Sequence, residues 1–224
     1  MKNDLLIHIP HSSLYIPEDY RKTALISPDE LEEENQFMRD SGVRELVPEA
    51  LMENALIFPY SRLYCDVERF RDGSEPMDAR GMGYIYTRDS RGREIFRPDA
   101  AHRAEVDSVY EAHHRELDER VSAIISEFGS CLIIDLHSYS DEAVDRLFGY
   151  TGCPDVCIGL DASSAGSARC RRVVSIIKKT CRSLGLSTMT DYPYKGSIVP
   201  NRFYGRADTG IVSVMLEINK RILV

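Results

Sequence analysis

The sequence lacks several features that would assign a protein to a class at once. No apolar run approaches the ~18 residues of a membrane-spanning helix, so we expect no membrane partner. The start, MKNDLLIHIPHSS, holds no apolar segment long enough for a signal peptide. The six cysteines form no CxxC pair, and Cys153 and Cys157 have no second pair to complete a metal site. We therefore expect reduced cysteines in a cytoplasmic protein.

An excess of positive charge is absent as well. The net charge is −8, whereas nucleic acids and anionic membranes both favour a basic face, so we expect neither as a partner. There is no internal repeat, low-complexity tract or composition break. A chain of 224 residues with 43% hydrophobic residues can bury a substantial core, which favours one domain over residues 1–224.

The stretch CLIIDLHSYSD, residues 131–141, carries the clearest signal. Its unbroken apolar start is typical of a strand buried on both faces of a parallel sheet. The polar residues then fall at the carboxyl end of the strand, where open α/β sheets bind ligands. His137 is a candidate zinc ligand there, and Asp135 could orient it. The alternative is a core histidine at a strand end.

Two further strands carry similar residues. The first predicted strand, LLIHI at 5–9, is followed at once by His11, a second candidate ligand, while His8 lies inside the strand and is expected in the core. The strand IVSVMLEI at 211–218 contains Glu217. A lone acid in a central strand is costly unless it is paired or functional, and we interpret Glu217 as functional.

The remaining pattern alternates strands with helices and predicts an α/β fold with a mainly parallel or mixed sheet. Residues 71–98 and 191–205 are expected to be long loops near the site, the first with a hairpin around 84–86. Further strands are predicted at 55–58, 63–67 and 155–160, and helices at 28–40, 42–52, 98–128 and 168–185.

Two acids outside these strands also stand out. Asp40 lies at the carboxyl end of the first predicted helix, where the helix dipole disfavours an acid, so we expect a cation nearby or else a simple loop cap. Asp66, in RLYCDVERF, is flanked by apolar residues and needs a buried partner. It could form a structural pair with Arg62 or Arg69, or support a ligand histidine beside an anion-binding arginine site.

Together these residue types suit one reaction class. Two histidines and a carboxylate hold a catalytic zinc ion with a position open for water, whose pKa the metal lowers. A glutamate can take the proton of the water, and an arginine can stabilise the oxyanion. A second arginine can bind a substrate carboxylate. His11, His137, Glu217, Arg62 and Arg69 therefore indicate metal-assisted hydrolysis of an amide in a small acidic molecule.

The motifs resemble those of the N-formylglutamate amidohydrolase family almost from end to end, through IPHSS, RLYCDVERF, IIDLHSYS, PYKGS and MLEIN. In addition, HSY at 137–139 is similar to the second-histidine motif of zinc carboxypeptidases, and DVER at 66–69 to the D-x-N-R motif of carboxypeptidases and aspartoacylases. The resemblance implies a single-domain, three-layer α/β/α fold of the phosphorylase/hydrolase-like kind. It also implies one zinc ion per chain and a part in histidine degradation.

The resemblance further implies roles for single residues. Asp66 would orient His11, Arg62 would polarise the scissile carbonyl, and Arg69 would bind a substrate carboxylate. Glu217 would be the general base that cleaves N-formyl-L-glutamate or a related N-acyl amino acid. In the loop at 191–205, the residues expected to contact the substrate are Tyr194 and Asn201.

Two positions depart from the wider pattern. The glutamate ligand that follows the first histidine by three residues is replaced by Leu14. We expect Asp40 to be the third zinc ligand instead, with Glu34 and Asp66 as alternatives. Glu68 replaces the asparagine of D-x-N-R and would repel a substrate carboxylate unless it points away.

Two other functions stay open at this point. A carboxypeptidase-type enzyme acting on acidic or cell-wall peptides would need an open cleft, whereas the two long loops favour a covered pocket for a small molecule. A non-catalytic member of the family could bind a small acidic ligand without a metal. The sequence does not indicate an oligomeric state.

Overall fold

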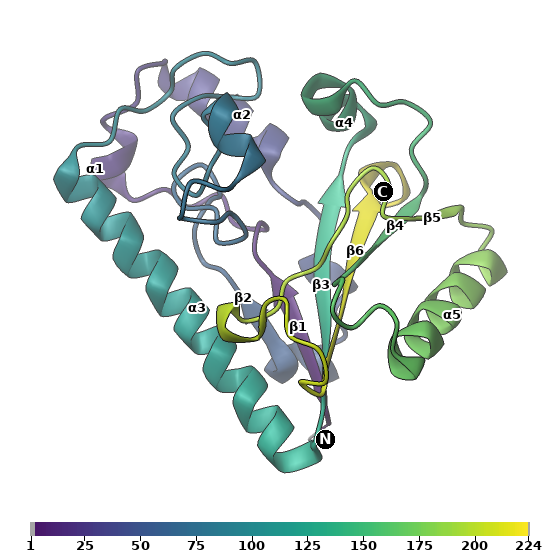
Figure 1. The fold of residues 1–224 in the computed structure, drawn as a ribbon. Helices are drawn as coiled ribbons and strands as arrows, with labels where there is room; N and C mark the ends of the chain where they lie inside the picture. Colours follow the sequence, from purple (N-terminus) through teal and green to yellow (C-terminus); the bar gives the residue numbers. More distant parts are fainter. Residues whose placement is uncertain (1–2, 224) are drawn as a thin grey trace.

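The structure, a computed structural model, describes residues 3–223, and its centre is a six-stranded sheet in the order β2-β1-β3-β6-β4-β5 (Figure 1). The strands β2, β1, β3 and β6 are parallel, whereas β4 runs antiparallel to β6 and carries β5 parallel to itself. This confirms the predicted α/β fold with a mixed, mainly parallel sheet. The strands are β1 (Leu5–Ile9), β2 (Ala55–Ile57), β3 (Cys131–Tyr139), β4 (Val156–Leu160), β5 (Thr188–Thr190) and β6 (Ile211–Asn219).

Helices cover both faces of the sheet. On one face, Leu117 of α3 packs with Ile133 of β3; on the other, Cys170 of α5 packs with Val212 and Val214 of β6. The two long helices therefore form the outer layers, as Figure 1 shows. The helices are α1 (Glu18–Arg21), α2 (Pro28–Met38), α3 (Ala100–Phe128), α4 (Asp141–Phe148) and α5 (Ala168–Ser183), with short 3-10 segments η1 (Arg44–Leu46), η2 (Glu49–Asn54), η3 (Pro76–Arg80), η4 (Asn201–Phe203) and η5 (Lys220–Ile222).

The alternation of side chains along a strand decides which face carries the polar residues. Ile133 faces α3, so Asp135 and His137, two and four residues later, face the same side. Glu217 of β6 stands beside His137 in the parallel register. The polar residues of both strands therefore gather on the α3 side, near the carboxyl end of the sheet.

Several local predictions were wrong. Residues 63–67 form a turn, not a strand, and are apolar because this loop is itself buried. The predicted helix at 42–52 is broken by Pro48 into η1 and η2. Around 84–86 there is only a single bridge between Met82 and Tyr86. The sequence analysis also missed α1, α4 and β5, and it ended β3 too early, so that His137 lies inside that strand.

The structure also describes the cysteines and the apolarity of the helices. The cysteines Cys65, Cys131, Cys153, Cys157, Cys170 and Cys181 are free and buried. Among residues 3–223, none of the helices combines the length and apolarity needed to cross a membrane.

Candidate active site

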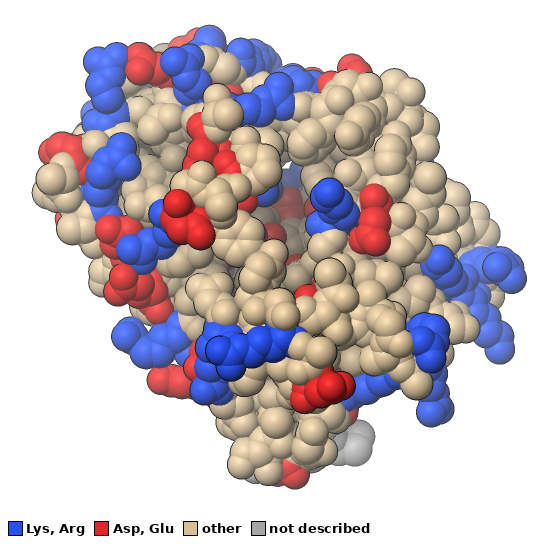
Figure 2. All heavy atoms as spheres, viewed as in Figure 1, with Lys and Arg blue, Asp and Glu red and all other residues tan. Residues whose placement is uncertain are grey.

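A cavity of about 810 Å³ opens at the carboxyl end of the parallel strands. Figure 2 shows the surface hollowed at this point, with acidic and basic side chains at the rim. Asp66, one of the ten predicted site residues, lies directly behind the cavity wall, hydrogen-bonded to His11 and Arg62. The other nine line the cavity: His11, Asp40, Arg62, Arg69, Asp135, His137, Tyr194, Asn201 and Glu217.

His11 follows β1 and presents one nitrogen to the cavity. Its Nε2 lies 2.9 Å from Oδ1 of Asp66, which fixes Nε2 as the hydrogen-bond donor. Its Nδ1 is buried without a hydrogen-bond partner and lies 3.7 Å from Oδ2 of Asp40. Burial and Arg62 lower the pKa of His11, but Asp66 and Asp40 outweigh them and raise it. A buried, unpartnered imidazole nitrogen beside a carboxylate suits a metal ligand.

His137 is held between three carboxylates. Its Nδ1 lies 2.9 Å from Oδ2 of Asp40, and its Nε2 lies 3.1 Å from Oδ1 of Asp135 and 3.3 Å from Oε2 of Glu68. Burial lowers the pKa of His137, but these carboxylates, Glu68 first, raise it well above its ordinary value. The surroundings thus strongly favour a positive charge at this imidazole, which a proton or a metal ion would supply.

Asp40 lies just beyond α2, which ends at Met38. Its backbone N–H donates to the carbonyl of His11 at 2.9 Å, and this bond holds its carboxylate between the two imidazoles. Burial raises the pKa of Asp40, but the contacts with His11 and His137 outweigh it and lower that pKa. The alternative ligand Glu34 is engaged elsewhere, since it accepts hydrogen bonds from the backbone and hydroxyl of Ser90 at 2.7 and 2.9 Å.

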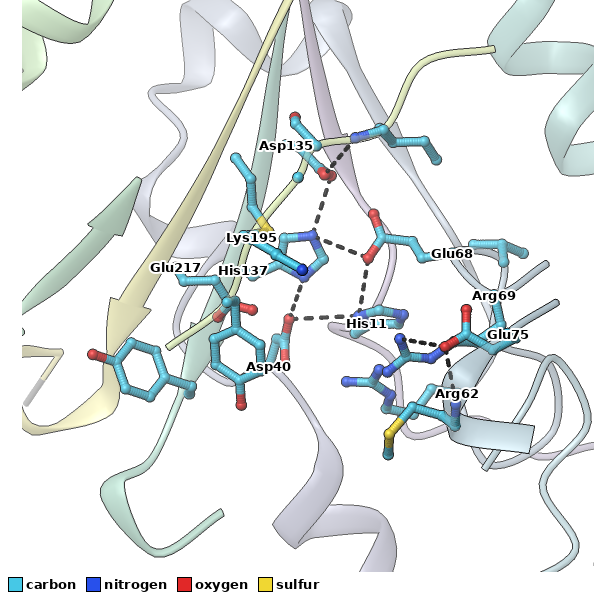
Figure 3. A pocket seen from close by; sticks show the side chains of 18 of the residues that line it. His11, Asp40, Arg62, Glu68, Arg69, Glu75, Asp135, His137, Lys195 and Glu217 are labelled. Carbon is cyan, nitrogen blue, oxygen red and sulfur yellow. Dashed lines mark hydrogen bonds and ion pairs between the residues drawn. The ribbon is translucent and has the colours of Figure 1, made fainter. Parts of the chain in front are cut away.

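These groups could hold a metal ion. Ligands about 2.0–2.1 Å from tetrahedral zinc lie roughly 3.3 Å from one another, close to the 2.9 and 3.7 Å that separate Asp40 from the two histidines. Two other groups have ligand atoms that all lie within 4.8 Å of one another, His11–Glu68–His137 and His8–Glu68–Asp135, and Asp40 belongs to neither of them. In Figure 3, Asp40 and Glu68 approach the imidazoles from different sides. Our sequence analysis missed Glu68 as a ligand candidate.

The arginines form an ion-paired group beside the histidines. Arg62 donates from Nε and Nη2 to Oδ2 of Asp66, at 3.2 and 2.7 Å. Nε of Arg69 lies 3.6 Å from the same oxygen without a hydrogen bond, and its Nη1 lies 3.5 Å from Glu75. Burial raises the pKa of Asp66, but Arg62, His11 and Arg69 together hold it well below its ordinary value. Asp66 therefore joins both arginines to His11.

Glu217 is buried at the inner end of the cavity, and its Oε2 has no hydrogen-bond partner. Burial, reinforced by Asp40 and Glu68 and opposed by His137 and Arg62, raises the pKa of Glu217 to about 8. A carboxyl group with a pKa near neutrality can both accept and return a proton at physiological pH.

The loop at 191–205 contributes the outer wall. Tyr194 is partly buried, and its ring contacts Tyr139 and Phe148 at centroid distances of 5.6 and 5.7 Å. Asn201 is exposed at the start of η4 and reaches the cavity from its rim. This loop and residues of the 71–98 segment both line the cavity that contains His11 and His137.

A second buried histidine pair lies on the α3 side of the sheet. His8, confirmed as a core residue, lies 2.8 Å from Oδ1 of Asp135 through Nδ1 and 2.9 Å from Nε2 of His113 through its own Nε2. The sequence analysis did not connect this pair with the site. Their positions allowed it, since His8 stands beside Asp135 in the parallel register of β1 and β3.

Known proteins resemble this chain in sequence and in fold. The sequence profile of the N-formylglutamate amidohydrolase family matches residues 3–224. The fold is similar to an N-formylglutamate amidohydrolase from Ralstonia eutropha JMP134, with 22% identity, a TM-score of 0.77, and coverage of 97% of this chain and 82% of that one. It is also similar to a gene product of Agrobacterium tumefaciens, with 19% identity, a TM-score of 0.72, and coverage of 99% and 82%. Among curated proteins no match was found.

Proposed function

Because the chain belongs to the N-formylglutamate amidohydrolase family and is therefore a hydrolase acting on amides, we propose that it cleaves an N-acyl amino acid, N-formyl-L-glutamate or a related compound, with one bound zinc ion. The observation that carries the proposal is the buried Nδ1 of His11, unpartnered beside Asp40 and His137. A buried nitrogen in this position is costly unless a ligand satisfies it.

We assign the metal to Nδ1 of His11, the carboxylate of Asp40 and Nδ1 of His137. In this arrangement each histidine keeps its Nε2–H for a buried carboxylate, Asp66 for His11 and Asp135 for His137. Such partners fix the tautomer and orientation of metal-binding imidazoles. The set with Glu68 is the alternative, and it would require His137 to bind through Nε2.

When bound, zinc lowers the pKa of a water molecule and polarises the scissile carbonyl. Glu217 takes the proton of the attacking water at its unpartnered Oε2 and delivers it to the leaving amine. Arg62 gives two nitrogens to Asp66, and this rigid support lets its remaining Nη1 stabilise the negative oxygen of the tetrahedral intermediate.

Substrate orientation falls to the outer residues. Nε of Arg69 has no hydrogen-bond partner, and this guanidinium can bind the α-carboxylate of the amino acid. Tyr194 and Asn201 close the opposite wall of the cavity and contact the remainder of the substrate.

The test is the zinc content of the purified protein together with its release of formate from N-formyl-L-glutamate. The wild-type chain, Asp40→Ala and Glu68→Ala are compared after identical zinc reconstitution. About one zinc per chain, lost in Asp40→Ala and retained in Glu68→Ala, supports the assigned ligands. Loss only in Glu68→Ala moves the third ligand to Glu68 and leaves the function standing. A wild-type protein that neither retains zinc nor hydrolyses N-acyl amino acids contradicts the proposed function.

A further inference from the structure

The cavity contains less free positive charge than a dicarboxylate substrate needs. Asp66 and Glu75 balance the charges of Arg62 and Arg69. Glu75 is itself buried, and its Oε1 lies 3.5 Å from Nη1 of Arg69. The backbone N–H of Met77 donates to the same Glu75 carboxylate at 3.2 Å, which holds it in place. Arg69 can therefore bind the α-carboxylate of a substrate. The two arginines have no surplus positive charge to neutralise a second carboxylate on the substrate side chain.

The two other cations that line the cavity do not correct this balance. Lys220 donates its Nζ to the carbonyl of Arg39 at 2.6 Å, and the nearby acids Asp40 and Glu217 offset its charge. Lys195 is exposed on the 191–205 loop, where water screens its charge. A substrate side chain placed beside Arg69 would therefore face the negative charge of Glu75.

The wall next to Glu75 is apolar. It consists of side chains from α2, η3, α4 and the turn after η3, and four of its six members belong to one buried cluster on which the other two pack. The apolar wall is formed by Phe37, Met38, Met77, Met82, Leu147 and Phe148. Three of these residues are methionines, whose flexible thioethers adapt to apolar groups of different shapes.

The volume of the cavity leaves room for an apolar group against this wall. At about 810 Å³ it falls within the range of roughly 300–1,000 Å³ that accommodates drug-sized ligands. N-formyl-L-glutamate has only a dozen non-hydrogen atoms and would leave the apolar wall wet. An apolar group placed against the wall would displace that water favourably.

We propose that the apolar wall is a side-chain subsite, and that the preferred substrates are N-acyl amino acids with uncharged, apolar side chains, which Glu75 favours over glutamate. This inference rests on the proposed amide hydrolysis and narrows its substrate class. Glu75 acts here as a specificity-determining residue, because a side-chain carboxylate would approach it without a cation to neutralise the pair.

The first experiment compares three substrates of similar length: N-formyl-L-methionine, N-formyl-L-glutamine and N-formyl-L-glutamate. The zinc-loaded wild-type protein should show kcat/KM values in that order, with about tenfold or more between methionine and glutamate. The glutamine compound separates the effect of charge from that of polarity. Equal or higher kcat/KM for N-formyl-L-glutamate overturns the inference.

The second experiment changes Glu75 alone. Glu75→Gln should raise kcat/KM for N-formyl-L-glutamate relative to N-formyl-L-methionine by about fivefold to tenfold, because it removes the facing charge. The matched control is Asp145→Asn, which removes an exposed acid of α4 outside the cavity and should leave the ratio unchanged. An unchanged ratio in Glu75→Gln overturns the role of Glu75.

A binding measurement separates this inference from the proposed function. Calorimetry compares free L-methionine with L-glutamate, the amino acids that hydrolysis would release. Tighter binding of methionine without any hydrolysis would support the subsite and contradict the proposed function. Hydrolysis of all three substrates with preferential binding of glutamate would support the proposed function and contradict the subsite. Binding of neither amino acid would also overturn the subsite.

Discussion

The molecule holds two buried histidine pairs on the same side of its sheet, and they differ in what their nitrogens face. His8 and His113 satisfy each other at 2.9 Å, and His8 gives its second nitrogen to Asp135. His11 and His137 are also supported by carboxylates, yet Nδ1 of His11 has no hydrogen-bond partner and borders the cavity. In the first pair, called the closed pair, both nitrogens of His8 have hydrogen-bond partners, although His8 also forms a possible metal-binding group with Glu68 and Asp135. The second pair leaves Nδ1 of His11 for a ligand.

The difference shows that burial and residue type do not by themselves identify a metal site. Both pairs contain histidines that are nearly inaccessible to solvent, and both share Asp135 as a hydrogen-bond partner. What separates them is the completeness of their hydrogen bonding and their position at or behind the cavity wall. The predictions below test this distinction, beginning with the largest expected effect.

Replacement of a cavity histidine should abolish metal binding, whereas replacement of a closed-pair histidine should not. We expect His137→Ala to lose its zinc and all measurable hydrolysis, because one of three protein ligands is gone. His113→Gln is the matched variant and should retain about one zinc per chain. Elemental analysis after gel filtration gives the result, and circular dichroism checks the fold. Stoichiometric zinc in His137→Ala would remove this residue from the ligand set.

Glu217→Gln should separate catalysis from binding at the cavity. The amide cannot accept the proton of water, so kcat should fall by about 10²–10⁴-fold while zinc content and KM change little. Steady-state kinetics with N-formyl substrates measures both constants. If KM rises and kcat is preserved, Glu217 binds substrate and is not the base.

Asp135 is hydrogen-bonded to both His8 and His137, so its replacement tests whether the contacts of His8 help to orient His137. In Asp135→Asn the amide oxygen can still accept hydrogen bonds from His8 and His137, but the side chain no longer carries the negative charge that faces them. We expect the zinc affinity to fall by about 10–100-fold, as for other residues that orient metal ligands. Competition with a zinc chelator measures this affinity. An unchanged affinity would show that the orientation of His137 depends on Asp40 alone.

Much of this site could be predicted because parallel strands bring their carboxyl ends to one edge. His11, His137 and Glu217 each follow or end an apolar run that reads clearly as a strand, and these strands proved adjacent. The family resemblance added the roles of residues such as Asp66 and Arg69, which lie on a loop without any periodic pattern. All these residues lie at the cavity or directly behind it.

The parts that could not be predicted depend on contacts distant in sequence. Glu68 and Glu75 lie in an irregular segment, and only the folded loop brings them to His137 and Arg69. His113 lies on α3, and its contact with His8 spans 105 residues. The turn at 63–67 has the apolar sequence expected of a strand because its side chains are buried in the core, although it is not paired in the sheet.

The closed pair should also influence stability in acid. Burial, with smaller contributions from His8, His114 and His11, lowers the pKa of His113 to about 2, whereas an unfolded histidine has a pKa of about 6.5. Between these values the unfolded chain binds a proton that the folded chain does not, so stability is lost as the pH falls below about 6.5. From pH 7 to pH 5 this residue should cost at most about 2 kcal/mol of unfolding free energy. Urea titrations at both pH values should show that loss reduced in His113→Gln. His102→Gln, at the amino-terminal end of the same helix and more exposed, should leave the loss unchanged, and equal behaviour of the two variants would show that His113 does not exclude the proton.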